Sequence, residues 1–322
     1  MKKYLIIRFS SIGDVVLTSP ILRCLKKQQP TAIIHYATKN AFGNIIKANP
    51  YVDKVYTIDK DIDEIVPQLI AEDYDFLIDL HHNLRTFRLK RRLKAPAASF
   101  PKLNFQKFLL TQFKTNRMPD VHVVERYFEA VKSIGVFNDA KGLDYFIPKE
   151  DEMDLTSLGL TSPFISIAIG AQFATKRLPI TQLKTLIAKI ELPVVILGGP
   201  TDVEVAEELE LTFPDLINLT GKISLNQSAS ILKQSLKVVT HDTGLMHIAS
   251  AFNVVIISIW GNTVPAFGMY PYMPEHQNQI KIHEVNVKCR PCSKIGYHAC
   301  PKKHFHCMTL QDLDAIAKDI NE

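Results

Sequence analysis

The sequence has no long hydrophobic run, and this absence limits where the protein is expected to work. Within its 322 residues, no apolar run approaches the ~20 residues that a membrane-spanning helix requires. Met1 to Lys3 lead directly into a strand pattern that ends at the polar Ser10 and Ser11, so we expect no signal peptide. These absences predict a protein of the cytoplasm.

Cysteine and excess charge are also scarce outside two short segments. Only one of the five cysteines, Cys24, lies outside the segment from Cys289 to Cys307, which argues against a disulfide framework and favours a local site. The formal net charge is only +5, but six basic residues fall between Arg85 and Lys94. That stretch is either a solvated helix face or an electropositive patch for phosphate, nucleic acid or a membrane surface.

What the sequence does contain is a regular alternation of strand-like and helix-like segments. Alternation of this kind predicts an α/β fold with parallel sheets, and the length suits two domains, which we place at residues 1–150 and 151–322 with a boundary within 148–162. Residues 95–120 lose clear periodicity and form either a mobile amphipathic loop or a buried connection. Predicted strands are 4–9, 32–37, 54–58, 76–80, 164–169, 194–197, 216–219, 238–240 and 254–259. Predicted helices are 14–27 (kinked or restarted at Pro20), 41–48, 63–72, 122–134, 179–190, 202–211, 225–235, 244–252 and 310–320.

The loop after the first strand is the main candidate for a site in the N-terminal half. It contains Ser10, Ser11, Gly13 and Asp14, and such loops face the ligand crevice of an open α/β sheet. Gly13 lets the backbone approach a ligand, and Asp14 is either a helix cap or a reactive base. The segment 79–83 follows the fourth strand and is expected at the same edge.

Two junctions in the C-terminal half have groups suited to a phosphate or a ribose. Lys176 and Arg177 precede a helix, where cations and unpaired N–H groups form a natural diphosphate site; the alternative is a pair of solvated surface cations. Asp202 can cap the next helix, and Glu204, one turn further, is a candidate to hold ribose hydroxyls.

A third junction gathers polar residues at one helix start. Asp242 ends a strand and is expected to cap the helix that begins with Thr243 and Gly244. Glycine disfavours helix by ~1 kcal/mol relative to alanine, so its place in a first turn indicates close approach to the backbone. His247 shares a helix face with Thr243 and is either part of this site or a core histidine.

The cysteine-rich segment has the spacing of a small zinc knuckle. Cys289, Cys292, Cys300 and Cys307 are separated by two, seven and six residues, and His298, His304 and His306 lie nearby. The prediction is a structural zinc site, with disulfides or free thiols as alternatives. Cys24, at an apolar helix position, is expected to be a core thiol.

These motifs together resemble glycosyltransferase family nine, the ADP-heptose:lipopolysaccharide heptosyltransferases. The resemblance covers nearly the whole chain and implies the GT-B architecture, with two Rossmann-like domains and the active site in the cleft between them. It also implies that the C-terminal domain binds the donor and that the last helix packs across the N-terminal domain. The segments that support the resemblance are 10–14 with 18–20, 79–85, 176–179 and 242–249.

The resemblance implies roles for individual residues. Asp14 matches the catalytic base, and Lys176 matches the lysine that holds the donor diphosphate, with Arg177 as a second cation. Glu204 matches an acid near the ribose. The remaining matches are the loop around the base (Ser10, Ser11, Gly13) and the donor-sugar and phosphate loop (Asp242, Thr243, Gly244, His247). Three departures bear on nucleotide packing and on the acceptor: Phe173 and Leu178 replace tryptophan, and His81-His82 replaces Gln-Gly.

The function implied is that of an inverting, metal-independent transferase that moves a sugar, heptose from ADP-heptose, onto a lipopolysaccharide-core or related glycolipid. An acceptor-side patch of Arg85, Arg88, Arg91 and Arg92 would meet this anionic acceptor at the inner face of the cytoplasmic membrane. The alternatives are another sugar-nucleotide enzyme of the same fold, such as an epimerase, and a zinc-containing nucleic-acid-binding protein. We expect no nucleic-acid partner and no cofactor for catalysis.

Overall fold

The computed structural model describes residues 1–160 and 163–322, which form two compact units. The N-terminal unit contains Met1–Lys102 and Val121–Phe146, and the C-terminal unit contains Leu103–Asp120 and Ile147–Glu322. The second unit thus resumes close to the boundary placed at residue 150, whereas residues 103–120 depart from that division. Thr161 and Ser162, within the expected boundary segment, lie outside the described residues.

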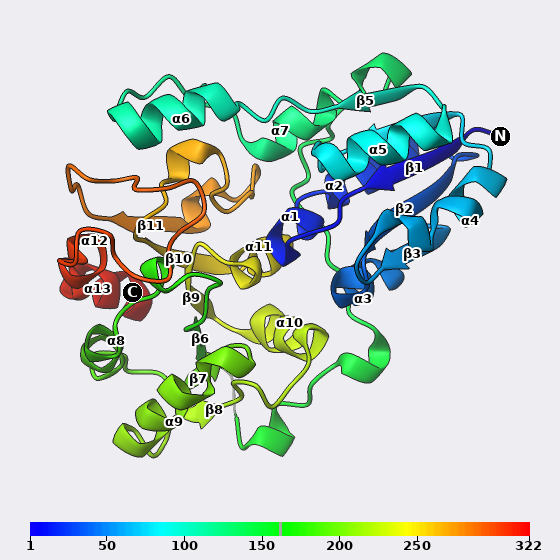
Figure 1. Ribbon diagram of the computed structural model, residues 1–322. Coiled ribbons are helices and arrows are strands. Elements are labelled where there is room, and N and C mark those ends of the chain that lie inside the picture. The colour runs from blue at the N-terminus through cyan, green and yellow to red at the C-terminus, as the bar shows by residue number, and fades with distance from the viewer. Residues whose placement is uncertain (161–162) are drawn as a thin grey trace. The chain divides into compact units, whose positions relative to one another are not determined.

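The N-terminal unit is built on a parallel sheet with strand order β3-β2-β1-β4-β5 (Figure 1). The chain runs from β1 through β2 to β3 and then returns to place β4 on the other side of β1. Open α/β sheets bind ligands beyond the carboxyl ends of the strands where the winding changes direction, which here is the β1–β4 pair. The strands are β1 (Lys3–Ile7), β2 (Ile33–Lys39), β3 (Lys54–Ile58), β4 (Phe76–Asp79) and β5 (Ala97–Ser99).

The C-terminal unit follows the same plan with strand order β11-β10-β9-β6-β7-β8. The winding changes direction between β6 and β9, which pair in the register Ile165↔Lys237 to Ala168↔Thr240. The loops that follow these two strands therefore lie side by side, although about 70 residues separate them. The strands are β6 (Ile165–Ala168), β7 (Val194–Leu197), β8 (Ile217–Asn218), β9 (Lys237–His241), β10 (Val255–Trp260) and β11 (Ile280–Glu284).

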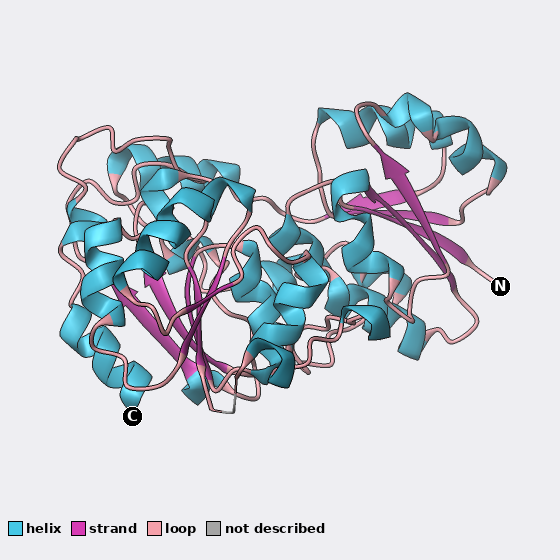
Figure 2. Cartoon of the chain, turned by 90° about the horizontal axis from the view of Figure 1, so that it is seen from below, coloured by secondary structure: helices cyan, strands magenta, loops and turns pink. Residues whose placement is uncertain are grey.

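Helices flank the strands of each sheet (Figure 2), which confirms the α/β prediction. Among the described residues, every helix is too short or too polar to cross a bilayer. The α-helices are α1 (Ile12–Val16), α2 (Ser19–Gln28), α3 (Gly43–Lys47), α4 (Val66–Ala71), α5 (Leu84–Leu93), α6 (Asn104–Phe113), α7 (Val123–Phe128), α8 (Ile180–Ile187), α9 (Val203–Thr212), α10 (Leu225–Gln234), α11 (Gly244–Ala251), α12 (His306–Thr309) and α13 (Leu313–Asn321). Short 3-10 helices include η2 (Ile62–Glu64), η3 (Lys132–Ile134) and η6 (Ala174–Lys176).

Each unit has its own apolar core. In the N-terminal unit, Leu5, Ile7 and Leu77 of the sheet pack with Leu69 of α4 and Leu89 of α5, and all five are fully buried. Strands that are apolar on both faces are typical of parallel sheets covered on both sides. This composition explains why the sequence alone located most strands.

Pro20 explains the break between α1 and α2. The segment predicted as one helix forms two, and Ser19 and Pro20 are the first residues of the second. Proline has no N–H group, and the start of a helix is where a missing N–H group costs least. The expected restart at Pro20 is therefore confirmed.

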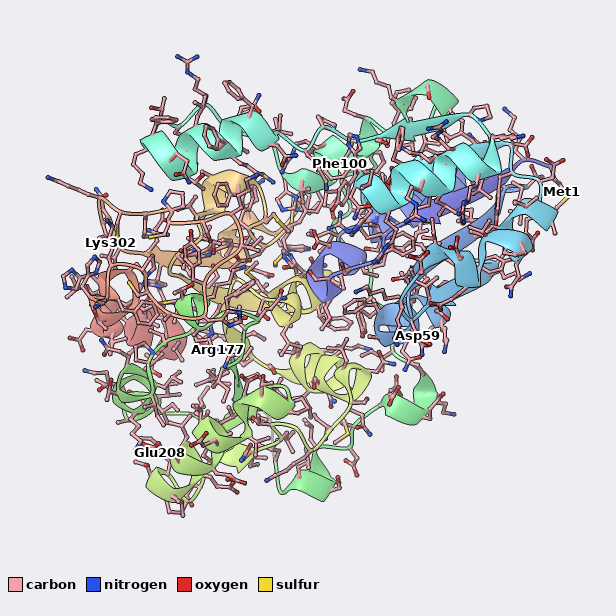
Figure 3. The ribbon with its side chains drawn as sticks, viewed as in Figure 1. Met1, Asp59, Phe100, Arg177, Glu208 and Lys302 are labelled. Carbon is pink, nitrogen blue, oxygen red and sulfur yellow. The ribbon has the colours of Figure 1, made fainter. Side chains whose placement is uncertain are left out.

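The segment 95–120 is neither a mobile loop nor a buried connection, because it contains β5 and α6. α6 lies at the surface of the C-terminal unit, as Figure 3 shows with its side chains. Its Leu110 and Thr111 are buried, whereas Phe105, Phe108 and Phe113 are exposed. The sequence reading missed this helix because its apolar residues do not face a core.

The C-terminal helix packs on its own unit. Ile316, Ala317 and Ile320 of α13 join the same core cluster as Ile257 of β10 and Leu183 of α8. The implied packing of the last helix across the N-terminal domain is therefore wrong. β11 was also missed, because this edge strand is only partly buried and lacks a continuous apolar run.

Candidate functional site

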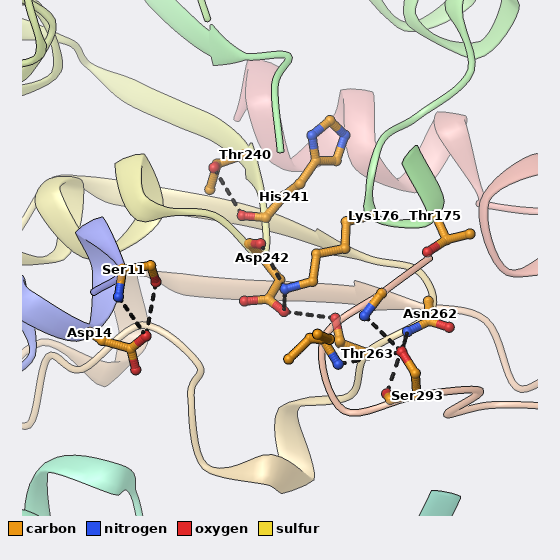
Figure 4. A network of polar contacts seen from close by, with 12 residues as sticks. Ser11, Asp14, Thr175, Lys176, Thr240, His241, Asp242, Asn262, Thr263 and Ser293 are labelled. Carbon is orange, nitrogen blue, oxygen red and sulfur yellow. Dashed lines mark hydrogen bonds and ion pairs between the residues drawn. The ribbon is translucent and has the colours of Figure 1, made fainter. Parts of the chain in front are cut away.

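The loop after β1 holds the carboxylate of Asp14 between three donors. Arg8 Nη2 lies 2.5 Å from Asp14 Oδ1. Ser11 donates to Asp14 Oδ2 from its N–H at 3.1 Å and from its Oγ at 2.8 Å (Figure 4). Ser11 is the N-cap of α1, and Asp14 is the third helical residue, which accepts the N–H of the cap. This corrects the interpretation of Asp14 as the cap itself.

Arg8 is a site residue that the sequence reading missed. It is 8% exposed, donates from Nε to Ser10 O at 2.8 Å, and donates from Nη1 to Leu80 O. One guanidinium thus connects the loops after β1 and β4, the two strands at the change of winding. The available signal was an arginine at the end of an otherwise apolar strand, because a buried charge needs a partner.

The electrostatics of this cluster keep Asp14 ionised. Burial alone raises the pKa of Asp14, but the charge of Arg8 and the donors on Ser11 outweigh it, so the pKa lies below its usual value. Burial and the charges of Arg8 and Lys102 lower the pKa of His81 to about 4. At neutral pH the cluster therefore contains a fixed carboxylate and an uncharged imidazole, whose ring packs edge-on against Phe9.

Two cations of the basic stretch have structural partners in the N-terminal unit. Lys90 Nζ of α5 lies 2.8 Å from the carboxylate of Asp79, whose side chain is fully buried, and Arg92 forms an ion pair with Asp63. Asp79 also accepts the N–H of His82 at 2.7 Å. Part of the motif at the end of β4 therefore anchors α5 to the sheet.

The other cations of α5 point in different directions. Arg85 lies over the ring of Phe9, with its guanidinium carbon 5.7 Å from the centroid. Arg88 and Arg91 are exposed, and Arg91 lies 5.9 Å from the ring centroid of the exposed Phe87. Of the three exposed arginines predicted to face an acceptor, Arg92 pairs with Asp63, whereas Arg88 and Arg91 form no ion pair among the described residues.

The C-terminal unit brings Lys176 and Asp242 together. Lys176 Nζ lies 2.6 Å from Asp242 Oδ2 and donates to Asp242 O at 3.3 Å, while Thr263 Oγ1 donates to Oδ2 at 2.7 Å (Figure 4). The three residues follow β6, β9 and β10, and their juxtaposition results from the strand order. Asp242 therefore does not cap α11 as expected, since its carboxylate is bound to these donors.

The helix start beside Asp242 is suited to an anion. Thr243 is the N-cap of α11, and among the described contacts its side chain makes no capping hydrogen bond. The first N–H groups of a helix have no intrahelical acceptor, so those of α11 point toward any ligand bound there. His247 is 2% exposed and lies on the buried side of α11.

Arg177 and Glu204 are not part of this cluster. Arg177 Nη1 lies 2.9 Å from Asp202 Oδ1, and its Nε donates to Ala171 O at 2.7 Å. Glu204 is exposed on α9. A Cβ atom at Gly170 would lie 2.1 Å from Asp202 Oδ2, so this glycine makes room for the Asp202 carboxylate.

The cysteine-rich loop braces the loops of the Lys176 cluster. Arg290 donates from Nη2 to Thr263 O at 2.9 Å, and Ser293 Oγ lies 3.0 Å from Asn262 Nδ2. Tyr297 accepts the N–H of Thr175 at 3.2 Å and donates its own N–H to Thr175 Oγ1 at 2.8 Å. The loop therefore holds Thr175, which precedes Lys176, and Thr263, which donates to Asp242.

The four cysteines of this loop are thiols, so the disulfide alternative is not realised. Cys289 Sγ lies 3.8 Å from His304 Nε2, and Cys292 donates to Cys289 O at 3.1 Å. Within residues 1–160 and 163–322, no group of three or more His, Cys, Asp or Glu side chains is placed to hold a metal ion. The zinc site stays a prediction. Cys24 is buried, as expected for a core thiol.

His241 makes the stability of the C-terminal unit depend on pH. Its Nε2 accepts the N–H of Leu178 at 3.0 Å, and burial, with the charge of Arg177, lowers its pKa to about 4. Below an unfolded-state pKa of ~6.5 the unfolded chain binds a proton that the folded chain rejects, so stability falls. We expect the free energy of unfolding to drop by about 2 kcal/mol from pH 6.5 to 4.5 through this residue.

Urea denaturation at the two pH values measures this effect. Other groups also titrate, so the relevant quantity is the difference between the wild type and His241→Gln, which should lack this part of the pH dependence. His298→Gln, at an exposed position, is the control and should behave as the wild type. Equal pH dependence in His241→Gln and the wild type would contradict the expectation.

Comparison of the sequence and the structure with known proteins points to one family. The model of the family described as glycosyltransferase family 9 (heptosyltransferase) matches residues 63–301. Lipooligosaccharide heptosyltransferase 2 of Haemophilus influenzae is 26% identical and is aligned over 91% of this chain and 93% of its own. A glycosyl transferase family 9 structure from Veillonella parvula has a TM-score of 0.79 at 24% identity, with 99% and 96% covered. The E. coli ADP-heptose lps heptosyltransferase II structure has a TM-score of 0.70 at 20% identity, with 99% of each chain covered.

Proposed function

The chain belongs to glycosyltransferase family 9, and from that membership we propose that it transfers heptose from ADP-heptose to a lipopolysaccharide-core or related glycolipid acceptor. The names of the Haemophilus and E. coli relatives support this choice of donor and acceptor. The observation that carries the proposal is the cluster of Lys176, Asp242 and Thr263 beside the start of α11. An epimerase or a nucleic-acid-binding protein is disfavoured by the family match.

The C-terminal unit supplies the groups that a nucleotide diphosphate needs. Lys176 uses two of its three N–H donors on Asp242, which leaves one to reach a phosphate oxygen. The backbone N–H groups at the start of α11 add further donors, and the helix dipole favours negative charge there. Because positive charge is already present where the leaving diphosphate gains charge, we propose that transfer requires no metal ion.

The N-terminal unit supplies the base. The acceptor hydroxyl oxygen bonds to the anomeric carbon, its proton passes to the Asp14 carboxylate, and the bond from that carbon to the diphosphate oxygen breaks. Arg8 and Ser11 hold this carboxylate in one orientation, and its lowered pKa keeps it deprotonated at neutral pH. A single displacement of this kind inverts the anomeric configuration.

The donor can be tested directly with the purified chain. Thermal unfolding would be followed with ADP, UDP, GDP and their sugar conjugates, since a ligand that binds only the folded state raises the melting temperature. We expect stabilisation by ADP and ADP-heptose and none by the other bases. No response to any nucleotide would contradict the transferase proposal. Transfer that persists in EDTA would support independence from metal.

The exposed arginines of α5 are proposed to attract the anionic acceptor. Each cation near an anionic surface contributes about 1 kcal/mol, so replacing Arg88, Arg91 and Arg92 with serine should raise the acceptor KM by at least about tenfold. Donor affinity should not change. Lys132→Ser, at a side chain that is 69% exposed in the same unit, controls for the loss of one surface cation away from α5. Unchanged acceptor KM in the triple variant would remove this assignment.

The metal content of the cysteine-rich loop is a separate prediction. The spacing of the four cysteines suits zinc, whereas their described positions do not converge on one ion, so elemental analysis decides. We expect about one zinc ion per chain in freshly purified, reduced protein. Cys289→Ser/Cys292→Ser should lose the metal, melt at lower temperature and bind ADP more weakly, because this loop braces Thr175. Cys24→Ser, which alters a core thiol outside this loop, is the control for metal content and should retain the zinc. A metal-free active wild type would contradict the prediction.

A further inference from the structure

Helix α6 turns its bulky apolar side chains toward solvent. Phe105, Phe108 and Phe113 are 67%, 47% and 65% exposed, and the rings of Phe108 and Phe113 pack edge-on against each other at 5.8 Å. Leu109 lies between them on the same side of the helix. A surface helix ordinarily directs its apolar stripe at the core, so this face is unpartnered among the described residues. We call Phe105, Phe108, Leu109 and Phe113 the outer face of α6.

The inner side of α6 is attached to the C-terminal unit, so the outward orientation is a fixed feature. Leu110 and Thr111 are buried. At the end of the helix, Lys114 Nζ donates to Thr111 O at 2.6 Å and to Pro291 O, in the cysteine-rich loop, at 2.7 Å. These contacts hold the helix while leaving three aromatic rings in water, where each ring loses the free energy that burial would provide.

The segment that contains this helix is basic. Residues 103–120, the part of the segment that belongs to the C-terminal unit, contain three cations, Lys107, Lys114 and Arg117, and one acidic residue, Asp120. A helix with aromatic residues on one face and flanking cations has the composition of helices that lie in a lipid interface.

We propose that the outer face of α6 docks onto an anionic membrane surface. The phenylalanine rings would enter the boundary between headgroups and acyl chains, while the flanking cations contact lipid phosphates. A second copy of this chain is a poorer occupant, because pairing two such faces would bring like charges together. The proposal does not rest on the transfer reaction, although docking would place the protein where a lipid acceptor resides.

Co-sedimentation of the full chain with vesicles tests the proposal without substrates. We expect binding to vesicles of phosphatidylcholine mixed with phosphatidylglycerol, weaker binding to phosphatidylcholine alone, and weakening by salt. Phe105→Ser/Phe108→Ser/Phe113→Ser should lower the partition coefficient at least about tenfold. Leu211→Ser controls for the loss of one exposed apolar side chain, since Leu211 is 85% exposed on α9.

Two further measurements identify the surface that binds. Phe108→Trp should show a blue-shifted emission and quenching by brominated lipid when anionic vesicles are added, whereas Leu211→Trp should show neither. The proposal is overturned if the triple serine variant binds as the wild type does, which would point instead to the exposed Leu84 and Phe87 of α5. It is equally overturned if the wild type ignores anionic vesicles, or if light scattering shows a dimer that the triple variant dissociates.

Discussion

Replacing Asp14 with asparagine is expected to lower kcat by about 100- to 10,000-fold, the usual contribution of a general base. Asparagine has nearly the same shape, and its side-chain oxygen can still accept the N–H of Ser11, so the start of α1 is preserved. What it loses is the ability to take the proton of the acceptor hydroxyl. Single-turnover transfer from ADP-heptose measures the loss, and the affinity for ADP should be nearly unchanged.

The ion pair between Asp14 and Arg8 adds a stability effect that must be separated from the loss of the base. Because Arg8 is almost fully buried, the neutral asparagine leaves its charge without a carboxylate, and we expect the variant to lose about 1–3 kcal/mol of stability. Ser11→Ala removes one donor to Asp14 while keeping the base, so its kcat should fall far less. If Asp14 only stabilised the helix start, Asp14→Asn would transfer heptose at nearly the wild-type rate.

Replacing Lys176 with methionine is expected to weaken ADP binding by about 10- to 100-fold. A hydrogen bond to a charged group contributes about 1.5–3 kcal/mol, and Lys176 is the cation placed at the start of α11. The rate of transfer should fall further than the affinity, because the leaving diphosphate carries more charge than the bound donor. Isothermal titration with ADP measures the first effect and single-turnover transfer the second.

The partner of Lys176 complicates this experiment, so two comparisons accompany it. Without Lys176, Asp242 retains Thr263 but becomes an unpaired carboxylate that would repel a diphosphate. Lys176→Met/Asp242→Asn removes that repulsion, and ADP binding should stay weak. Lys184→Met, at a half-buried side chain of α8 that pairs with Glu208, controls for the loss of one positive charge from an ion pair. Full recovery of ADP affinity in the double variant would show that Lys176 only neutralises Asp242.

The sequence predicted the elements of the fold well where the apolar pattern reflects a core. Strands such as Ile165–Ala168 and Val194–Leu197 are fully buried, and a continuous apolar run is sufficient to identify them. The sequence predicted the elements poorly where the apolar residues do not lie in a core. α6 has its phenylalanines in solvent, and β11 is a partly buried edge strand. In both cases local composition does not report what the element packs against.

The candidate site shows the same division. Asp14, Lys176 and Asp242 were singled out because polar residues follow predicted strands at the ligand edge of a parallel sheet. Arg8 and Thr263 were missed, because composition does not show which carboxylate each one binds: Arg8 pairs with Asp14 in its own loop, and Thr263 donates to Asp242 in the neighbouring loop. Arg177 was predicted to join Lys176 in the phosphate site. It pairs with Asp202 instead, whereas Lys176 pairs with Asp242.

The sequence by itself determined that the chain forms strands and helices in alternation, that polar loops follow particular strands, and which family those loops resemble. Local composition and spacing contain this information, because burial and helix capping act over a few residues. Only the tertiary structure decided which loops meet. Lys176 and Asp242 lie together because β9 pairs with β6, and Arg8 connects two loops because β4 pairs with β1. Such pairings depend on the packing of whole strands.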